Sequence, residues 1–415
     1  MKQLACRSCR NPLQHTFVDL GMSPLCESYI DARHLDQPEA FYPLQVYLCD
    51  RCFLVQLPEH VTPERIYSEY AYFSSYSDSW IEHMRGYCDS VIDRFGLNTD
   101  SLVMEIASND GYLLQHFAQR QIPCLGIEPA GNVARAAIDR GIPTRIQFFG
   151  DKVAGELARE HGKPGLLIGN NVLAHVPDLN GFVGGMKKLL KPGGVITMEF
   201  PHLLKLIEQN QFDTIYHEHY SYLSLYATEP VFARHRLELF DVEELPTHGG
   251  SLRIYAKHAN DAQHPVSVRI DRLRTRERAF GVDRLQTYSD FRERVAQSKR
   301  KLLQFLIEAK RNGKRIAGYG APGKGNTLLN YCGIRGDFFD YTVDRSPYKQ
   351  GLYTPGTRIP ILHPDRIFET RPDYVFILPW NLADEISRQM ARIRDWGGQF
   401  VVPIPEVAVL TPAPG

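Results

Sequence analysis

Residues 103–112 constrain the fold of this chain more than any other segment. A short β-rich run at 103–106 breaks into small and polar residues before a helical pattern begins at Leu113. A buried strand that delivers its C-terminal end to a tight turn and a helix N-terminus forms a ligand cradle in open α/β sheets. We therefore expect this turn to bind a cofactor through Glu105, Ala107, Asn109, Asp110 and Gly111.

An acidic residue ends the next apolar run. Residues 124–127 are followed by Glu128 and Pro129, which we expect to contact the same cofactor. A carboxylate at the tip of the second strand accepts hydrogen bonds from both hydroxyls of a ribose, which indicates a cofactor that carries a nucleoside. The alternative is an ordinary strand-helix turn that binds no ligand.

The spacing of the turn separates two classes of cofactor. Dinucleotide sites use G-x-G-x-x-G, whereas this turn contains the single glycine Gly111. Acid-x-small-x-x-acid-Gly after a strand is similar to the first motif of class I S-adenosylmethionine-dependent methyltransferases. In those enzymes glycine usually stands at the position of Ala107. This resemblance implies S-adenosylmethionine as the cofactor.

Length and composition limit the class of protein. A chain of 415 residues is too long for a single core and predicts roughly two to three domains. The 48 basic and 48 acidic residues cancel, so the overall charge favours neither a nucleic acid nor an anionic membrane as a partner. No run approaches the roughly 20 apolar residues that cross a bilayer, and residues 1–6 lack the apolar core of a signal peptide. We therefore expect a cytoplasmic protein.

Four of the eight cysteines form two C-x-x-C pairs, Cys6 with Cys9 and Cys49 with Cys52. Brought together, four thiolates form a closed tetrahedral site for a structural Zn²⁺. The alternative is four unrelated buried thiols. Zinc knuckles also occur in nucleic-acid binders, but this segment has no basic cluster interleaved with aromatic residues. We expect Cys26 to be a buried thiol rather than a fifth ligand.

Residues 67–80 are unusually rich in tyrosine and serine. Such a segment suits a lid that presents phenols and hydroxyls to a polar ligand. A hydrogen-bonded linker into the helix that begins near residue 78 explains the composition equally well.

Strands and helices alternate through the middle of the chain, which predicts a parallel, doubly wound sheet. Ligands bind at the C-terminal ends of the strands in such sheets. Asn170, Asn171 and His175 follow the fourth strand, so we expect the two asparagines to contact the cofactor. His175 either touches the substrate or is a structural residue. The main strands are expected at 102–106, 124–127, 166–169 and 194–200.

A dense cluster of polar groups lies at 212–222, with three tyrosines, two histidines and two carboxylates in eleven residues. His217 and His219 could be read as a metal pair, but the H-E-x-x-H spacing of zincins is absent. A histidine beside a carboxylate is a better general base, because the carboxylate fixes the tautomer and stabilises the imidazolium. We therefore expect His219 to act as a base that Glu218 orients.

A glycine pair follows His248, and close approach of the backbone to an anionic ligand is easy there. A hairpin turn explains this stretch as well.

The loop at 318–325 contains four glycines, whose free amides can wrap a phosphate, and Lys324 adds charge. It is not a Walker motif, because Asn326 follows the last glycine. Asp344 ends the next strand and mimics Glu128. We expect this region to hold a nucleotide or a sugar diphosphate, with a pure scaffold as the alternative.

These patterns predict three α/β or zinc-binding parts. A small zinc-binding module is expected at 1–66, followed at 67–260 by a class I methyltransferase domain with a Rossmann-like doubly wound sheet. A second Rossmann-like α/β domain is expected at 261–415, where a nucleotide-sugar would bind.

The order of the motifs resembles that of a known family. After the zinc knuckle come Y-x-Y-F-S-S-Y-S, E-I-A-S-N-D-G, N-N-V-x-A-H-V-P-D, Y-H-E-H-Y-S-Y, H-G-G-S-L-R and G-Y-G-A-P-G-K-G-N-T. This order is similar to that of the nucleotide-sugar C-methyltransferases, which include the C-3'-methyltransferases of branched deoxysugar biosynthesis. The similarity covers nearly the whole chain.

The resemblance implies a dTDP-linked 4-keto deoxysugar as the substrate, methylated at C-3. It implies that His219 is the base and Glu218 its neighbour in the site. The other implied groups are His175 and Tyr72 as hydrogen-bonding partners of the sugar, Tyr216 as a lining residue, and Lys324 and Asn326 as contacts of the nucleotide-sugar. Further candidates for substrate binding are Tyr76, Tyr222 and His248.

The proposed chemistry agrees with the residues themselves. A C–H bond next to a ketone is acidic enough for a histidine if the enolate oxygen is hydrogen-bonded, and no catalytic metal is required. Two other classes remain open: an O- or N-methyltransferase on the same scaffold, and a non-enzymatic zinc-ribbon scaffold or nucleic-acid binder. We expect a monomer whose partner is the nucleotide-sugar, with no nucleic acid and no membrane.

Overall fold

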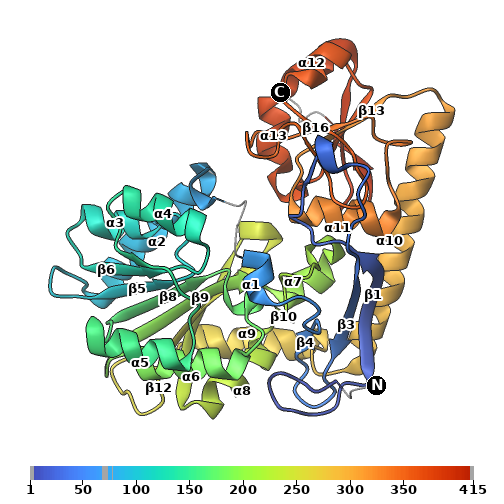
Figure 1. The fold of residues 1–415 in the computed structure, drawn as a ribbon. Coiled ribbons are helices and arrows are strands. Elements are labelled where there is room, and N and C mark those ends of the chain that lie inside the picture. Colours follow the sequence, from blue (N-terminus) through green and yellow to red (C-terminus); the bar gives the residue numbers. More distant parts are fainter. Residues whose placement is uncertain (1–3, 68–72, 77, 412–415) are drawn as a thin grey trace.

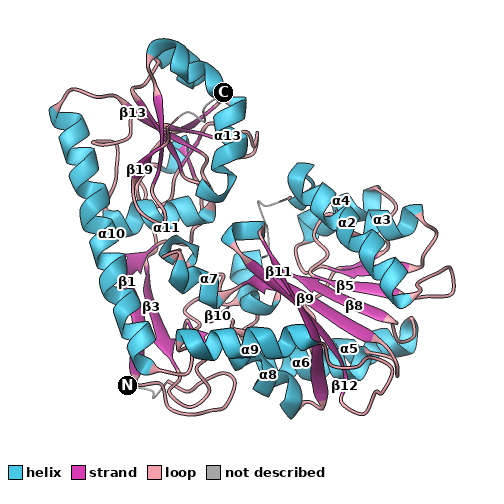
Figure 2. Cartoon of the chain, turned by 180° about the vertical axis from the view of Figure 1, so that it is seen from behind, coloured by secondary structure: helices cyan, strands magenta, loops and turns pink. Residues whose placement is uncertain are grey.

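The computed structural model describes residues 4–67, 73–76 and 78–411. Its ribbon contains an N-terminal, a central and a C-terminal sheet, and a long helix runs beside the first and the third (Figures 1 and 2). No helix among the described residues is long and apolar enough to cross a membrane.

The central sheet has seven strands in the order β11-β12-β9-β8-β5-β6-β7. Strands β5 to β9 run parallel, as predicted, whereas β12 pairs antiparallel with both β9 and β11. A short turn joins β11 to β12, and such turns connect antiparallel neighbours. The bounds are β5 (Val103–Ile106), β6 (Cys124–Ile127), β7 (Thr144–Arg145), β8 (Leu166–Asn170), β9 (Val195–Pro201), β11 (Leu237–Leu245) and β12 (Ser251–His258).

Helices cover both faces of this sheet (Figure 1). Side chains alternate along a strand, so Leu166 and Ile168 pack with α2 and α3 while Leu167 packs with α5, α6 and α8 on the other face. The predicted doubly wound arrangement is therefore confirmed. The helices are α2 (Asp78–Phe95), α3 (Leu114–Gln119), α4 (Gly131–Asp139), α5 (Asp151–Glu160), α6 (Leu179–Leu189) and α8 (Leu225–Arg234).

The C-terminal sheet has the order β16-β14-β13-β17-β18-β19 and is parallel except at β19. It forms the predicted second α/β unit. Its strands are β13 (Ile316–Tyr319), β14 (Thr342–Val343), β16 (Ile361–Leu362), β17 (Tyr374–Ile377), β18 (Gln399–Val402) and β19 (Ala408–Val409), and its helices are α11 (Gly323–Cys332), α12 (Arg366–Thr370) and α13 (Ala383–Gln389).

The N-terminal sheet takes its fourth strand from the predicted catalytic segment. Its antiparallel strands follow the order β1-β3-β4-β10, in which Ser221 pairs with Gln56 and Tyr222 with Val55. The Leu57 N–H also donates to the Tyr220 carbonyl at 3.0 Å. The N-terminal part therefore holds the segment that carries His219. The strands are β1 (His15–Ser23), β3 (Tyr42–Leu48), β4 (Val55–Gln56) and β10 (Ser221–Tyr222).

Other elements join the N-terminal and C-terminal parts. The long helix α10 packs against β1, where the rings of Phe17 and Phe291 stack at 4.7 Å. One hydrophobic core contains residues of the N-terminal sheet, α7, α10 and the C-terminal sheet, so these parts are packed together. The remaining helices and strands are α1 (Pro63–Tyr67), α7 (Leu203–Glu208), α9 (Val268–Phe280), α10 (Leu285–Arg311), and the antiparallel pair β2 (Ile30–Asp31) with β15 (Leu352–Tyr353).

Short 3-10 helices connect several of these elements. They are η1 (Ala32–His34), η2 (Ser74–Tyr76), η3 (Leu173–His175), η4 (Phe212–Thr214), η5 (Thr247–Gly249), η6 (Trp380–Leu382) and η7 (Ala391–Trp396).

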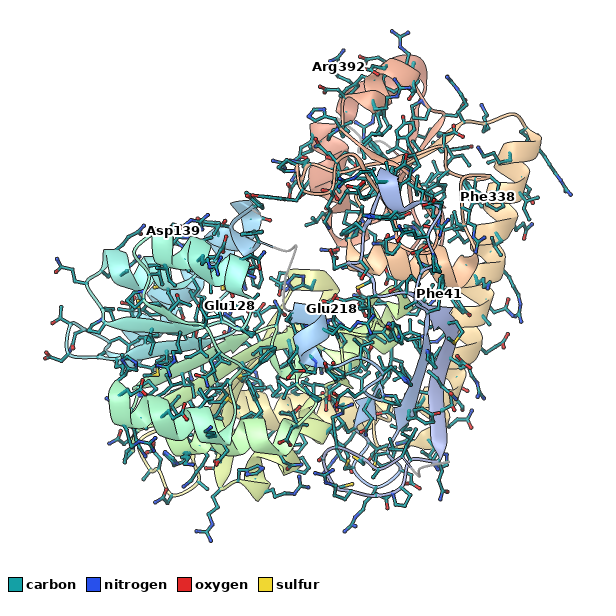
Figure 3. All side chains as sticks on the ribbon, in the orientation of Figure 1. Phe41, Glu128, Asp139, Glu218, Phe338 and Arg392 are labelled. Atoms are coloured by element: carbon teal, nitrogen blue, oxygen red, sulfur yellow. The ribbon has the colours of Figure 1, made fainter. Side chains whose placement is uncertain are left out.

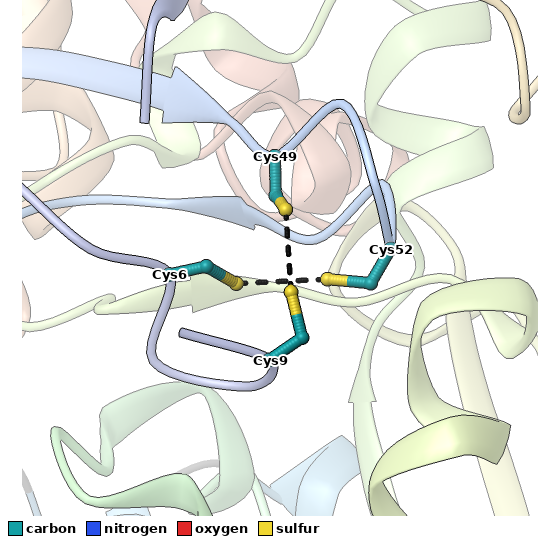
Figure 4. Close-up of side chains that lie close together, drawn as sticks. All are labelled: Cys6, Cys9, Cys49 and Cys52. Carbon is teal, nitrogen blue, oxygen red and sulfur yellow. Dashed lines mark hydrogen bonds between the residues drawn. The ribbon is translucent and has the colours of Figure 1, made fainter. Parts of the chain in front are cut away.

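The side chains of the four predicted cysteine ligands point toward one another (Figure 4). Their sulfur atoms all lie within 4.8 Å of one another, with Cys6 and Cys52 at 3.5 Å and Cys9 and Cys49 at 3.6 Å. Zinc–sulfur bonds of about 2.3 Å in a tetrahedron separate the sulfurs by about 3.8 Å, so these residues fit a structural zinc ion. The Gln56 side chain on β4 also donates to the Cys6 sulfur at 3.2 Å.

We expect loss of zinc to destabilise residues 220–222 more than the central sheet. The variant Cys9→Ala removes one zinc ligand. Gln56 on β4 donates to the sulfur of another ligand, Cys6, and β4 pairs with β10, so loss of the metal should weaken the β4–β10 pairing. Hydrogen exchange should speed up at 55–57 and 220–222 more than at 166–170, and bound zinc should fall in elemental analysis. Cys124→Ala, which removes a thiol of the central part, is the control. Unchanged exchange at 220–222 after zinc loss would contradict this coupling.

Candidate functional site

The turn after β5 has an unusual backbone. Ala107 and Asn109 have φ angles of 58° and 49°, in the left-handed region that non-glycine residues rarely adopt. Such a conformation costs about 1–2 kcal/mol per residue and persists where the surrounding structure holds it, often at ligand sites. Gly111 has a φ of 78°, and a Cβ there would lie 3.1 Å from Ile142. The turn thus requires glycine at position 111. At position 107 alanine is present, and its left-handed backbone conformation is strained.

Glu128 lies beside this turn, as predicted (Figure 3). Its carboxylate accepts hydrogen bonds from the Asn109 N–H at 2.9 Å and the Ala130 N–H at 2.8 Å. Burial raises the pKa of Glu128 to about 7, although these two backbone hydrogen bonds act in the opposite direction. Pro129 follows it, half-buried, at the start of α4. Through these hydrogen bonds the Glu128 carboxylate connects the turn after β5 with the segment after β6.

Several buried acceptors around the turn lack a hydrogen-bond donor among the described residues. They include Glu105 Oε2, Asp110 Oδ1, Asn170 Oδ1 and Asn171 Oδ1. An unsatisfied buried polar atom costs about 1–3 kcal/mol, so these acceptors are able to accept hydrogen bonds from a ligand. S-adenosylmethionine carries an ammonium group and two ribose hydroxyls that can donate. The residues at the ends of β5, β6 and β8 fit this cofactor.

The described part of the tyrosine-rich segment contacts both the cofactor turn and the C-terminal part. The Ser74 N–H donates to Asn109 Oδ1 at 2.9 Å, and the Ser75 hydroxyl donates to the Asp110 carboxylate. On the other side, the Phe73 ring stacks on Tyr348 at 5.6 Å, and the exposed Tyr76 lies 6.2 Å from the same ring. Tyr72, a predicted sugar contact, lies outside the described residues.

His219 is buried. It follows Glu218 in the chain, and Glu218 lies between the central, N-terminal and C-terminal parts (Figure 3). The His219 Nδ1 lies 2.8 Å from the Thr214 carbonyl oxygen, which can only accept a hydrogen bond. Nδ1 therefore carries the proton and Nε2 carries the lone pair. Burial lowers the pKa of His219 to about 4, with further lowering by His248 and Lys324 and an opposing effect of the Thr214 hydrogen bond. The ring is neutral at neutral pH.

The group that orients His219 differs from our expectation. We expected the Glu218 carboxylate, but the Thr214 carbonyl holds the ring. Glu218 instead accepts a hydrogen bond from the Cys26 thiol at 3.5 Å. The Cys26 carbonyl in turn accepts from the Asn326 side chain at 2.7 Å. Glu218 thus lies where the N-terminal, central and C-terminal parts meet, and Cys26 is buried as expected.

Three other predicted residues surround the His219 ring. His175 lies edge-on at a centroid distance of 4.7 Å, Tyr216 lies at 4.0 Å and Tyr222 at 6.1 Å. The His175 Nδ1 is 2.7 Å from the hydroxyl of Tyr67, the first residue of the tyrosine-rich segment 67–80. The structure therefore brings the predicted base and its predicted neighbours together.

His217 points away from this cluster. Its Nε2 lies 3.2 Å from the Pro43 carbonyl oxygen, whereas His219 faces Thr214. The two histidines do not converge on one point. Among the described residues, the four cysteines form the only group placed to hold a metal ion.

Lys324 reaches the same region from the C-terminal part. Its Nζ donates to Asn381 Oδ1 at 2.8 Å and lies 4.8 Å from the centre of the Trp380 ring. The Trp380 indole donates to Asp213 at 2.6 Å. Burial lowers the pKa of Lys324 while Asp213 opposes that shift, and burial raises the pKa of Asp213 to about 6. Trp380 and Asn381 follow β17, a strand end where ligands bind in such sheets, so strand position could have suggested them.

His248 joins the cofactor side to the Lys324 side. It has a φ of 55°, and its Nε2 lies 3.2 Å from the side-chain nitrogen of Asn171, whose φ is 52°. A Cβ at Gly249 would lie 2.5 Å from Trp380, so glycine is required there. Burial lowers the pKa of His248 to about 4. The stretch is a hairpin turn, and it also places a histidine in the site.

The glycine loop at 318–325 makes hydrogen bonds and close contacts with other segments of the same chain. The Ala321 carbonyl accepts hydrogen bonds from Tyr29 at 2.5 Å and from Lys349 at 2.9 Å. Asp344 accepts from the Ala321 N–H at 2.8 Å. A Cβ at Gly323 would lie 2.9 Å from the Cys26 sulfur. The loop thus packs on the N-terminal part, and Lys324 is the residue that it directs to the site.

Comparisons with known proteins agree with this architecture. Residues 6–67 match a zinc-binding domain family, 80–239 a methyltransferase domain family, and 246–405 the family described as the C-methyltransferase C-terminal domain. The chain is 36% identical over 409 residues to the C-methyltransferase NovU of Streptomyces niveus, which covers 98% of this chain and 96% of NovU.

Two solved methyltransferase structures are each similar to less than half of this chain. An S-adenosylmethionine-dependent methyltransferase of Clostridium acetobutylicum is 12% identical, with a TM-score of 0.35, over 43% of this chain and 91% of that chain. The magnesium protoporphyrin IX methyltransferase of Synechocystis is 16% identical, with a TM-score of 0.32, over 46% of this chain and 88% of that chain.

The three family matches and the near full-length similarity to NovU together show the activity class. The chain belongs to the family of S-adenosylmethionine-dependent C-methyltransferases that includes NovU, and it carries the zinc-binding cysteine cluster of that family.

Proposed function

We propose that this enzyme methylates C-3 of a nucleotide-linked 4-keto deoxysugar, with a dTDP-sugar as the expected substrate, through an enolate. The observation that carries the proposal is His219, a buried neutral imidazole with Nδ1 fixed by Thr214 and Nε2 available as a base. The family resemblance of the motifs supports the choice of a nucleotide-sugar.

His219 Nε2 removes the proton from the carbon next to the ketone. The electrons of that C–H bond form the enolate double bond, and negative charge develops on the carbonyl oxygen. Hydrogen-bond donors near His219 stabilise this charge, and His175, Tyr216 and Tyr72 are the proposed donors. The enolate carbon then accepts a methyl group, and this displacement depends chiefly on positioning.

The cofactor supplies an electrophilic methyl group on a sulfonium when it is bound. Glu128 would bind the ribose hydroxyls, while Glu105, Ala107, Asn109, Asp110, Gly111, Pro129, Asn170 and Asn171 would line the rest of the cofactor. The strained turn and the unpaired buried acceptors support this assignment.

Lys324 gives the site a preference for an anionic substrate. It is a half-buried lysine whose ammonium charge lowers the pKa of His219. An anionic diphosphate that pairs with Lys324 would cancel part of this effect, so the pKa of His219 would rise when the substrate binds. Asn326, His248, Tyr76 and Tyr222 are proposed as further contacts of the nucleotide-sugar.

A sugar O- or N-methyltransferase is the second candidate. It would use the same cofactor and a base for a hydroxyl or an amine. It predicts no hydrogen exchange at a carbon next to a ketone, which distinguishes it from the first proposal.

We expect Glu128→Gln to bind S-adenosylhomocysteine about 10-fold more weakly, equal to about 1.4 kcal/mol. The amide offers one acceptor oxygen where the carboxylate offers two, so the Asn109 or the Ala130 N–H loses its partner. Isothermal titration calorimetry measures the change. Glu160→Gln, on the exposed end of α5, should bind normally. Equal binding by the two variants would remove Glu128 from the cofactor site.

We expect His219→Asn to abolish exchange of the C-3 proton of a dTDP-4-keto-6-deoxysugar in D₂O with S-adenosylhomocysteine. Loss of a general base lowers the rate about 10²- to 10⁴-fold, and NMR follows the C-3 signal. His217→Asn is the matched control, because His217 faces Pro43 and should leave exchange intact. Exchange retained in His219→Asn would exclude this base. No exchange by the wild type with any keto-sugar would favour the O- or N-methyltransferase.

We expect Lys324→Met to raise the KM for the nucleotide-sugar about 10- to 100-fold, since a hydrogen bond to a charged group contributes about 1.5–3 kcal/mol. A base must be neutral, so kcat/KM falls as the pH drops through the pKa of His219, about 4 in the free enzyme. Removal of the Lys324 charge raises that pKa and moves the acid limb to higher pH. Lys314→Met, an exposed lysine paired with Asp373, should change neither quantity.

A further inference from the structure

Two oppositely charged side chains, Asp213 and Lys324, lie near each other without forming an ion pair. Asp213 is buried, and its Oδ1 makes no hydrogen bond within the described residues. Burial raises the pKa of Asp213 to about 6, and the charge of Lys324 is the main effect in the opposite direction. A buried carboxylate close to an ammonium group normally pairs with it, because an unpaired buried charge is costly. Some other group must therefore keep these two apart.

Trp380 in η6 contacts both charged groups with different parts of one indole. Its Nε1–H donates to Asp213 Oδ2 at 2.6 Å. The Lys324 Nζ lies over the ring, 4.8 Å from its centre. The edge of an aromatic ring is the positive end of its quadrupole and the face is the negative end, so an edge suits a carboxylate and a face suits an ammonium. One side chain thus provides a separate partner for each charge.

The indole of Trp380 has little room to move. An added Cβ at Gly249 would lie 2.5 Å from its six-membered ring. The indole also packs against two hydrophobic cores, and one of them is shared by the N-terminal and C-terminal sheets. The preceding residue, Pro379, lies against the glycine loop, since a Cβ at Gly320 would be 2.5 Å from it. Packing therefore holds Trp380 in contact with both Asp213 and Lys324.

We propose that Trp380 is a positioning residue that prevents Lys324 from pairing with Asp213. A lysine ammonium has three N–H donors. Asn381 accepts one of them at 2.8 Å, and Lys324 makes no other hydrogen bond within the described residues. Its remaining donors are available to an anionic ligand. A direct ion pair with Asp213 would occupy them and would neutralise the charge.

The use of this arrangement in catalysis rests on the proposed function, in which Lys324 binds the diphosphate of a nucleotide-sugar. A buried Lys324–Asp213 ion pair would have to break each time the substrate binds, which would weaken binding. The face of the Trp380 ring attracts the ammonium without occupying its N–H donors. Trp380 touches no reacting atom and acts through Lys324.

The state of Lys324 can be measured without substrate. NMR of the full-length protein labelled with ¹³C at lysine Cε follows the titration of each amino group, and Lys324→Met assigns the signal. Trp380→Phe keeps an aromatic ring beside Lys324 but removes the N–H from Asp213. We expect the carboxylate to pair with Lys324 and to raise the pKa of its amino group, because an opposite charge favours the ammonium. An unchanged or lower pKa in this variant would overturn the proposal.

The double variant Trp380→Phe/Asp213→Asn separates capture by Asp213 from a general change of the site. We expect Trp380→Phe to bind dTDP about 10-fold more weakly in calorimetry with S-adenosylhomocysteine present. The double variant should bind dTDP at least as tightly as the wild type, and the pKa of Lys324 should fall again. A double variant that recovers neither quantity would overturn the proposal. Trp396→Phe is the matched control, because its indole donates to the Pro372 carbonyl at 3.0 Å, within the C-terminal part.

Two further outcomes are distinguishable. If the wild type does not bind dTDP, the proposed nucleotide-sugar substrate fails, and the titration of Lys324 still decides the role of Trp380. If Trp380→Phe does not fold, the indole signal of the wild type decides it. The chain contains three tryptophans, so their ¹H–¹⁵N indole signals are readily assigned. A Trp380 signal that does not shift in Asp213→Asn would overturn the proposal.

Discussion

A short run of backbone hydrogen bonds holds the candidate site together. The β4–β10 pairing joins the cysteine-bearing part to the segment that carries His219, and the Leu57 N–H donates to the Tyr220 carbonyl. The Tyr220 N–H then donates at 2.8 Å to the Ala174 carbonyl, beside His175. Strands of two residues have little stability of their own, so the packing around them fixes their position. The backbone next to His219 and the backbone next to His175 are therefore connected, through these hydrogen bonds, to the strand that adjoins the cysteine cluster.

The candidate site is assembled from all three parts of the chain. The central part contributes the cofactor turn and His219, the N-terminal part contributes Cys26 against Glu218, and the C-terminal part contributes Lys324. A common hydrophobic core packs the first and third parts against α7 and α10. This explains why the family similarity spans almost the whole chain rather than the methyltransferase domain alone.

Local patterns predicted the parts of the site that lie within one segment. The cofactor turn, Glu128 and the cysteine pairs follow from strand ends and spacing, because each depends on near neighbours in sequence. The orienting role of Thr214 could not be predicted, since a backbone carbonyl has no sequence signature. Tyr67 meets His175 across 108 residues and Trp380 meets Asp213 across 167, so only the fold reveals these pairs. Only the fold likewise reveals β10, a strand of two residues that joins a sheet formed by residues far away in the sequence.

The order of the strands in the N-terminal sheet has a consequence for biosynthesis. Its first three strands end at residue 56, its fourth comes from residues 221–222, and the helix that backs it ends at Arg311. Domains generally fold from the N-terminus as they are synthesised, but this sheet has an open edge and an uncovered face until most of the chain has emerged. The strands β1, β3 and β4 are therefore made well before the elements that complete their sheet. Contacts between residues so distant in sequence slow folding in general, and an open strand edge offers unpaired backbone groups to other chains until the sheet is complete.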